Sequence, residues 1–398
     1  MLKLYNSKTR EKEIFKPLKK NKVSIYVCGI TPYDTTHLGH AFTYIFFDVL
    51  VRYLIFSGYK VNYTQNVTDI DDDIVKKAKE EKTDYKKLGD FWTEIFLLDM
   101  KSLNVLPPTH FVKATHSIDK MTEIINVLLK NGFAYKNGGN VYFDVSKFKK
   151  YGRLSKFNKK QMILISKERG GDPNDPLKKN PLDFILWQGA KENEPSWDAP
   201  FGRGRPGWHI ECSAMVNKYL GVKIDIHGGG KDLIFPHHES EIAESESYAG
   251  ESPFVRYWMH TAMVLVSGEK MSKSLGNLIM IKDLLTKYSP NAIKWMILSH
   301  HYRHPWEYEE KELNVCEDYI RETTIALEQI NKVSIRKIKA DSYLKDFICI
   351  MNDDLDTPKV LQLISKIAKR IQREKNKSNI KGLQEVLKTI ITTLGLKL

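Results

Sequence analysis

The first strand–helix–strand segment constrains the fold more than any other part of the chain. Residues 23–28 form a short run of β-favouring residues, residues 39–57 have the length of a helix, and residues 60–66 alternate like a strand. A strand, a helix and a second strand in this order predict a parallel βαβ unit, so the expected fold class is α/β. Functional loops in such sheets follow the carboxyl ends of the strands, where Cys28 and Asn66 fall.

Other patterns predict the remaining architecture. We expect a helix over 115–132, a strand over 223–226 with the three glycines at 228–230 as its turn, and a strand over 259–266. A helix should begin at Thr357, with one buried apolar stripe formed by Val360, Leu361, Ile364, Ile367, Ala368 and Ile371.

These elements group into two expected domains. The first, residues 1–306, should hold a Rossmann-type parallel sheet in two halves, at about 20–110 and 195–260. A connective insertion at about 111–194 should separate the halves, and a further loop region should follow at about 261–306. The second, residues 307–398, should be an α-helical bundle.

Composition limits the class of protein. The chain is 42% hydrophobic and 28% charged, which is ordinary for a globular protein in water. Its net charge of +13 fits a polyanion partner such as nucleic acid, but also a lysine-rich solvated surface. Four cysteines give no disulfide framework, the first 20 residues lack a signal peptide, and the apolar run at 43–57 is too short to span a bilayer. We expect a cytoplasmic protein with no membrane partner.

Two short motifs are typical of nucleotide chemistry. His37 and His40 flank Gly39 at the start of the predicted helix, where their spacing places both rings on one face beside free N–H groups that bind phosphate. Lys270 and Lys273 lie in a small-residue loop, where two ammonium groups can neutralise charge on a transferred phosphate. Either motif alone also fits a core histidine or a polar turn, but together they predict activation by ATP.

Soft metal ligands accompany these motifs. His237 and Glu241 are spaced i, i+4 on one helical face, and with Cys28 and Cys212 they offer two sulfurs, a nitrogen and a carboxylate oxygen. The plain alternative is two buried cysteines and a polar helix. A zinc ion held by this set, with Glu241 as fourth ligand at rest, could bind a substrate thiolate and discriminate against a hydroxyl analogue. The combination predicts an enzyme that adenylates cysteine.

These residues resemble the cysteine-activating branch of the class I aminoacyl-tRNA synthetases, from about Tyr26 to the end of the chain. The branch contains cysteinyl-tRNA synthetase and the mycothiol cysteine ligase, which joins cysteine to the amine of glucosaminyl-inositol. The form of residues 28–40, the ERGGDP stretch at 168–173 and the end of the chain at Leu398 favour the ligase. Residues 225–229 and 238–241 and the positive charge favour the synthetase.

We therefore expect a mycothiol cysteine ligase with an amino-sugar acceptor, and keep the charging of tRNA(Cys) as the alternative. A third reading is an inactive relative that binds tRNA or a protein, but such a protein would not need His37, His40, Lys270 and Lys273. A monomer is expected.

The resemblance also implies which residues act. His37, His40, Lys270 and Lys273 would be catalytic, and one zinc ion per chain and ATP as its Mg²⁺ complex would be required. Cysteinyl-adenylate and ATP would contact residues at strand ends and loops, namely Cys28, Gly29, Ile30, Thr31, Gly39, Thr43, Asn66, Val67, Thr68, Trp208, Gly230, Lys231, Asp232 and Val264. The aspartates at 69 and 71–73 fit helix capping better than a metal site.

Overall fold

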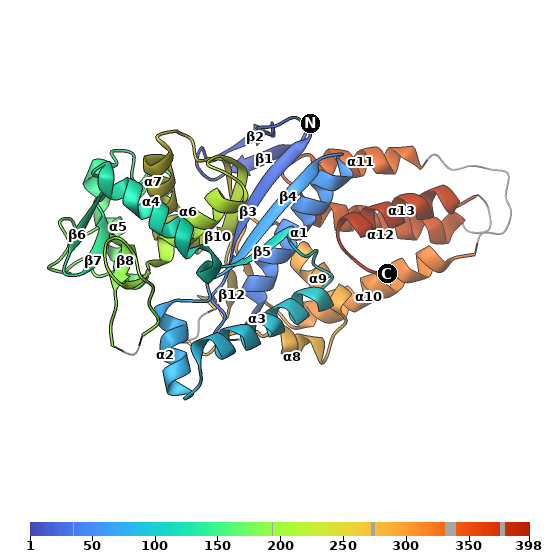
Figure 1. Cartoon of the computed structure of the whole chain (residues 1–398). Helices are drawn as coiled ribbons and strands as arrows, with labels where there is room; N and C mark the ends of the chain where they lie inside the picture. The colour runs from blue at the N-terminus through green and yellow to red at the C-terminus, as the bar shows by residue number, and fades with distance from the viewer. Residues whose placement is uncertain (35, 193, 272–274, 331–339, 375–378) are drawn as a thin grey trace.

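A computed structural model describes the chain apart from residues 35, 193, 272–274, 331–339 and 375–378. At its centre is a five-stranded parallel sheet in the order β11-β10-β3-β4-β5 (Figure 1). Its strands are β3 (Lys22–Ile30), β4 (Lys60–Val67), β5 (His110–Lys113), β10 (Ile224–Gly230) and β11 (Val255–Thr261). The predicted α/β class is confirmed.

The central sheet is buried on both faces, as parallel sheets usually are. Alternate side chains of β3 enter different hydrophobic cores. Ile25 and Val27 pack with α1 (Leu38–Phe56) and the C-terminal helices, whereas Tyr26 and Cys28 pack with the insertion and the second half of the sheet. The sheet therefore separates two cores.

Helix α1 is the central helix of the first core. Among the described helices it alone is long and apolar enough to cross a membrane, and 78% of its most apolar window is buried inside the protein. A core helix passes the same test, so this helix is weak evidence for a membrane span.

Between β4 and β5 the chain forms α2 (Asp72–Glu80) and α3 (Tyr85–Ser102). Asp71 caps α2 by accepting hydrogen bonds from the backbone N–H groups two and three residues further on. Asp69 accepts a hydrogen bond from the Thr115 hydroxyl at 2.6 Å. The predicted capping role is thus confirmed for Asp71.

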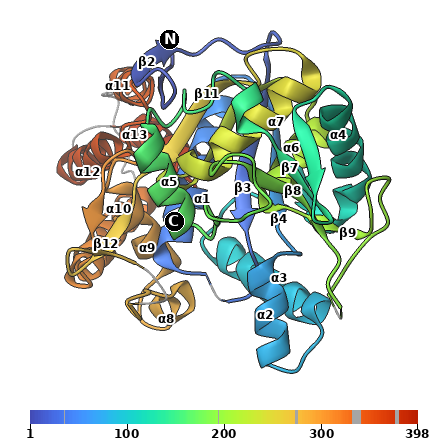
Figure 2. The same cartoon turned by 90° about the vertical axis from the view of Figure 1, so that its left-hand side faces the viewer.

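The insertion carries a sheet of its own, which the sequence analysis did not predict. This sheet is antiparallel and consists of β6 (Ala134–Asn137), β7 (Asn140–Phe143), β8 (Phe184–Gly189) and β9 (Gly204–Pro206). Its helical segments are η1 (Ala114–Ser117), α4 (Ile118–Lys130), η2 (Val145–Lys147) and α5 (Lys159–Glu168). Figure 2 shows the insertion in front of the central strands.

The second half of the sheet differs from prediction at its glycines. It comprises α6 (Trp208–Tyr219), β10, η3 (Lys231–Leu233), η4 (Ile234–His238), α7 (Glu239–Ala249) and β11. The glycines at 228–230, predicted as a turn, belong to β10. A Cβ at Gly228 would lie 2.0 Å from Cζ of Phe47, so this glycine lets α1 pack against the strand.

The strand predicted over 259–266 is two strands. β11 ends at Thr261 and β12 (Val264–Val266) begins a separate small sheet with β13 (Glu269–Lys270) and β14 (Trp306–Glu307). Between them the backbone N–H of Ala262 donates to the carbonyl of Tyr302 at 2.7 Å, which turns the chain away from the central sheet.

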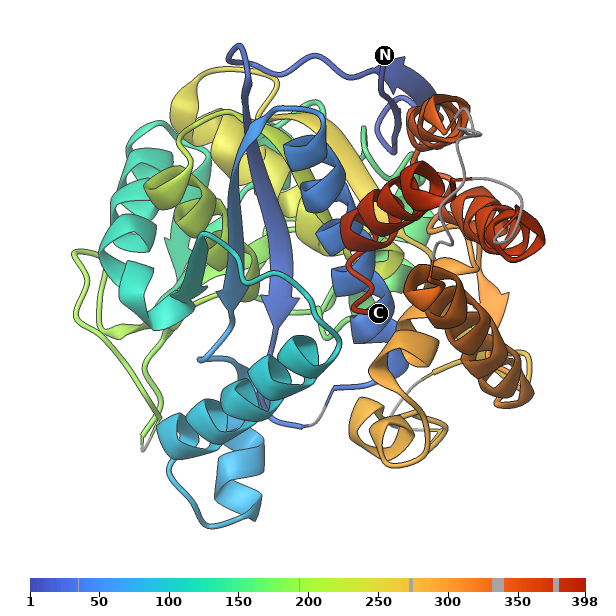
Figure 3. The same cartoon turned by 90° about the vertical axis from the view of Figure 1, so that its right-hand side faces the viewer.

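The remaining elements are mostly helical. They are the hairpin β1 (Lys3–Asn6) and β2 (Glu11–Ile14), then α8 (Ile281–Leu285), α9 (Pro290–Leu298), α10 (Lys311–Glu328), α11 (Asp341–Met351), α12 (Thr357–Glu374) and α13 (Lys381–Thr393). Figure 3 shows the C-terminal helices, in orange to red, gathered on one side of the molecule. Helix α12 begins at Thr357 and buries the whole predicted stripe. The predicted domain boundary at 306 stays a prediction.

Candidate active site and metal centre

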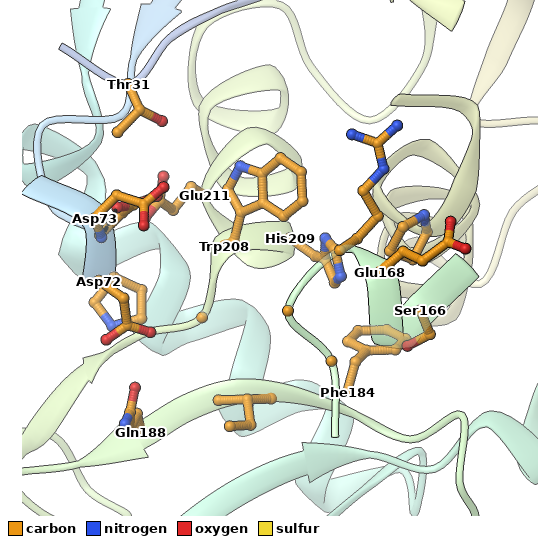
Figure 4. Close-up of a pocket in the computed structure, with 18 of the residues that line it drawn as sticks. Thr31, Asp72, Asp73, Ser166, Glu168, Phe184, Gln188, Trp208, His209 and Glu211 are labelled. Atoms are coloured by element: carbon orange, nitrogen blue, oxygen red, sulfur yellow. Dashed lines mark hydrogen bonds between the residues drawn. The ribbon is translucent and has the colours of Figure 1, made fainter. Parts of the chain in front are cut away.

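A cavity of about 1040 Å³ opens beside the carboxyl end of β3. Gly29, His37 and His40 line it from the first motif, and residues 168–172 line it from the insertion. Figure 4 shows Trp208, from the first turn of α6, among the lining side chains. The first nucleotide motif, the insertion and α6 therefore meet at one cavity.

His37 and His40 lie together at this cavity, as their spacing predicts. Their rings are stacked with centroids 3.8 Å apart. His37 is the N-cap of α1, and its Nδ1 accepts a hydrogen bond from the backbone N–H of Gly39 at 3.1 Å. A Cβ at Gly39 would lie 3.0 Å from the His37 ring, so glycine leaves room for the stack. Two imidazoles and a helix N-terminus thus adjoin the same cavity.

The second motif reaches the site through Lys270 and Met271. The Nζ atom of Lys270 is 3.5 Å from Oδ2 of Asp232, and Nη1 of Arg169 is 3.4 Å from the same oxygen. Met271 lines the cavity. Asp232 therefore connects the second motif to the insertion. Lys273 lies outside the described residues, and its role stays a prediction.

The four predicted metal ligands come together in the interior. One ligand atom from each of Cys28, Cys212, His237 and Glu241 lies within 4.8 Å of the others, and all four residues are buried. The two Sγ atoms are 3.8 Å apart, and Nε2 of His237 is 3.2 Å from Oε1 of Glu241. The end of β3, α6, η4 and α7 each supply one ligand. Two sulfurs, a nitrogen and a carboxylate oxygen at this spacing are consistent with a zinc site.

Further histidines surround this cluster, and the sequence analysis missed them. Nε2 of His227 is 2.9 Å from Oε2 of Glu241, and Nε2 of His238 is 3.3 Å from Sγ of Cys28. Nδ1 of His238 is 2.8 Å from Nε2 of His260. Cys28, His227, His238 and Glu241 form a second group with all ligand atoms within 4.8 Å. The doubled histidine before α7 was the available signal.

Burial sets the charge of these groups. It raises the pKa of the Cys28 and Cys212 thiols, and it lowers the pKa of His209 and His260 to about 3. The two histidines are therefore neutral at physiological pH. The thiols would become thiolates, the form that binds metal, only with a cation beside them.

The other predicted contact residues fall into two groups. Gly29, Ile30, Thr31 and Trp208 line the cavity. The lining of this cavity does not include Cys28, Gly39, Thr43, Asn66, Val67, Thr68, Gly230, Lys231, Asp232 or Val264. Contact of these residues with an adenylate stays a prediction.

Asn66 has a clear structural role behind the cavity wall. Its Oδ1 accepts a hydrogen bond from the backbone N–H of Gly29 at 2.8 Å, and its Nδ2 donates to the Thr68 hydroxyl at 3.3 Å. A Cβ at Gly29 would lie only 1.5 Å from the carbonyl oxygen of Asn66. Glycine is therefore required where the ends of β3 and β4 approach each other.

Comparison with known proteins identifies the family. The profile of the family described as tRNA synthetases class I (C) catalytic domain matches residues 14–318, and that of the DALR domain matches residues 346–398. The chain is 42% identical over 399 residues to a cysteine–tRNA ligase of Histophilus somni (strain 2336), covering 100% of this chain and 86% of that protein. The chain belongs to the cysteine–tRNA ligase family. Members of this family are ATP-dependent ligases, and this chain is one.

Other relatives agree. A cysteine–tRNA ligase of Haemophilus influenzae (strain PittGG) is 44% identical, with 100% of this chain and 86% of that protein covered. That of Methanococcus maripaludis (strain C7 / ATCC BAA-1331) is 43% identical, with 94% and 80% covered. The structure of Mycobacterium tuberculosis methionyl-tRNA synthetase in complex with methionyl-adenylate has a TM-score of 0.67 at 12% identity, covering 94% of this chain and 89% of that one. This last similarity shows a shared fold.

The predicted mycothiol cysteine ligase, with glucosaminyl-inositol as acceptor, is wrong. Relatives that are 42% and 44% identical along the whole chain are cysteine–tRNA ligases. The alignments cover 100% of this chain and 86% of each of these relatives. The stretch at 168–173 does not decide between the two families, because six residues count for less than identity over the full length.

Proposed function

We propose that this ligase charges tRNA(Cys) with cysteine, and that it selects cysteine through a zinc-bound thiolate. The buried cluster of Cys28, Cys212, His237 and Glu241 carries the proposal, because it lies on the same strand end and helix as the cavity-lining residues Gly29 and Trp208. The names of the relatives support tRNA(Cys) as the acceptor.

Amino-acid selection follows from the donor set. Cys28, Cys212, His237 and Glu241 would hold one zinc ion, which supplies a Lewis-acid site that prefers a thiolate to a hydroxyl group. Serine lacks the sulfur and would bind poorly, so the first binding step can supply the discrimination. The histidines around the cluster would orient the ligands by hydrogen bonds, as groups around a metal site usually do.

Activation requires stabilisation of negative charge on ATP. The carboxylate of cysteine attacks the α-phosphorus, and the bond to pyrophosphate breaks. We assign His37 and His40 to hydrogen bonds with the phosphates of Mg²⁺-bound ATP, and Lys270 and Lys273 to the charge that develops as pyrophosphate leaves. Asp232, 3.5 Å from Lys270, would hold that ammonium group near the cavity before the nucleotide arrives.

Transfer to tRNA completes the reaction. A hydroxyl of the terminal ribose attacks the carbonyl carbon of the adenylate, AMP leaves, and an ester forms. The net charge of +13 suits a polyanionic acceptor. We place the reaction in the cytoplasm, with the chain acting as a monomer.

The test is a charging assay with the full chain, Mg²⁺-ATP, labelled cysteine and a tRNA(Cys) transcript. We expect alkali-labile label on tRNA(Cys) and none on a tRNA(Ser) transcript. Cysteine-dependent pyrophosphate exchange without any charging of tRNA(Cys) would contradict the proposed acceptor. Equal activation of serine and cysteine would contradict the proposed selection.

A further inference from the structure

Glu211 is a buried carboxylate without a partner in the wall of the cavity. It lies in the first turn of α6 and is only 1% exposed, yet it lines the cavity. Neither of its carboxylate oxygens meets the geometry of a hydrogen bond with another described residue. Burial raises the pKa of Glu211 well above its usual value, and the nearby Thr68 hydroxyl offsets only part of that rise. A buried carboxylate without a partner is costly, so the structure needs another group to complete this position.

The neighbouring carboxylates of this wall are engaged. Asp71 accepts two backbone hydrogen bonds at the start of α2. Asp72 pairs with Arg205, and Asp73 lies against the hydroxyl of Tyr33. Figure 4 shows Glu211 beside Trp208, on the same side of the cavity as Asp72 and Asp73. Of these four acidic side chains, Glu211 is the one left to bind a cation.

The position of Glu211 relative to the metal cluster defines which cation this is. Burial raises the pKa of the Cys212 thiol, and the charge of Glu211 adds to that rise, so the Glu211 carboxylate is close to the site proposed for the substrate thiolate. In cysteine only two carbon atoms separate the sulfur from the amino nitrogen. A thiolate held at the cluster therefore keeps the amino group within a short distance of it, on the cavity side.

We propose that the Glu211 carboxylate binds the α-ammonium group of the cysteine substrate. This inference rests on the proposed function, because it takes cysteine to be the amino acid bound. Glu211 would make the enzyme select a thiol that carries an adjacent amine, whereas the metal cluster would select only the thiol. The two selections come from adjacent residues of one helix, and both are made before ATP reacts.

The test compares two thiols that differ in the amino group. L-cysteine and 3-mercaptopropionate share the thiol and the carboxylate, and only cysteine has the amine. Their dissociation constants are measured by calorimetry on the zinc-loaded full chain without ATP. In Glu211→Gln we expect cysteine to bind about 10- to 100-fold more weakly, since a hydrogen bond to a charged group is lost, and 3-mercaptopropionate to bind as before. Glu211→Asp should keep part of the preference for cysteine over 3-mercaptopropionate that Glu211→Gln loses.

Glu244 supplies a matched control. It is also fully buried, but its carboxylate accepts a hydrogen bond from the Ser213 hydroxyl at 2.6 Å and does not line the cavity. Glu244→Gln should leave the preference for cysteine unchanged. A Glu211→Gln variant that keeps the wild-type preference, or loses affinity for both thiols equally, would overturn the inference. A wild-type chain that binds neither thiol would contradict the proposed cysteine site itself, and this inference with it.

Discussion

Lys294→Met should lower the free energy of unfolding by about 3 kcal/mol, because it breaks a buried ion pair. Lys294 lies on α9 with no solvent exposure, and its Nζ donates to Oδ2 of Asp48 on α1 at 2.8 Å. Asp48 also accepts hydrogen bonds from Nε of Arg52 and the backbone N–H of Leu106, both at 2.9 Å. The cluster joins α1, which begins at the first motif, to α9, which comes after α8 and the second motif.

The remaining partners set the size of the effect. Removal of one partner of a buried pair costs about 3–5 kcal/mol, and Asp48 keeps a cation and a backbone donor after the loss of Lys294, so we expect the lower end. Asp48→Asn removes the anion that pairs with both Lys294 and Arg52, so we expect its loss of stability to lie at the upper end of this range. The double variant should lose less than the sum of the two changes, because the two residues interact directly.

Urea unfolding followed by tryptophan fluorescence measures these differences. Burial lowers the pKa of Lys294 from its usual 10.5. As the pH rises towards 10.5, the unfolded wild-type chain binds more protons than the folded chain, so its stability relative to Lys294→Met should rise. A variant within about 0.5 kcal/mol of wild type at pH 7 would refute this reasoning, since that is the scale of an ordinary surface change.

Three shorter predictions concern the cavity. Lys270→Ala should slow cysteine-dependent pyrophosphate exchange by about 10²-fold, whereas Lys282→Ala, on the exposed side of α8, should not; equal rates would count against the role of Lys270. Gly29→Ala should abolish this exchange, because its Cβ would lie 1.5 Å from the Asn66 oxygen, and a folded variant with normal kinetics would disprove the close approach. Burial raises the pKa of Asp71 from 3.8 to about 6, so its carboxyl group stabilises the fold at low pH and loses this effect as the pH rises through 6. Asp71→Asn should therefore gain stability relative to wild type between about pH 4 and pH 7 in urea unfolding, and a constant difference would contradict this.

The clustering of Cys28, Cys212, His237 and Glu241 follows from the sequence because its signal is local chemistry. Cysteine and histidine are uncommon and bind soft metals, and the spacing of His237 and Glu241 places them on one face of a helical segment. The ends of strands in a parallel sheet converge, which brings Cys28 to the same place. Each of these signals is present in the sequence itself, before any tertiary contact between side chains is known.

Features that depend on tertiary contacts were not predictable in the same way. The glycines at 228–230 read as a turn, and only the packing of Phe47 against Gly228 explains why they continue a strand. The four strands of the insertion are mostly four residues or fewer, too short for a clear alternation of apolar and polar residues. Glu211 attracts attention only once its burial and its lack of a partner are visible.

The acceptor was predicted wrongly for a related reason. His37, His40 and the four clustered side chains are the residues to which we assign the activation of cysteine, and the resemblance gives this step to both families of the branch. The proposed acceptor therefore rests on similarity over the whole chain, and not on the residues of the site.

X-ray absorption at the zinc K-edge, with and without cysteine, tests the central claim most directly. For the zinc-loaded chain alone we predict two sulfur neighbours at about 2.3 Å, from Cys28 and Cys212, with lighter ligands completing the shell. Saturating cysteine should raise the count to three sulfurs, and serine should leave it at two. A zinc ion without sulfur neighbours, or a sulfur count that cysteine does not change, would contradict selection through a metal-bound thiolate.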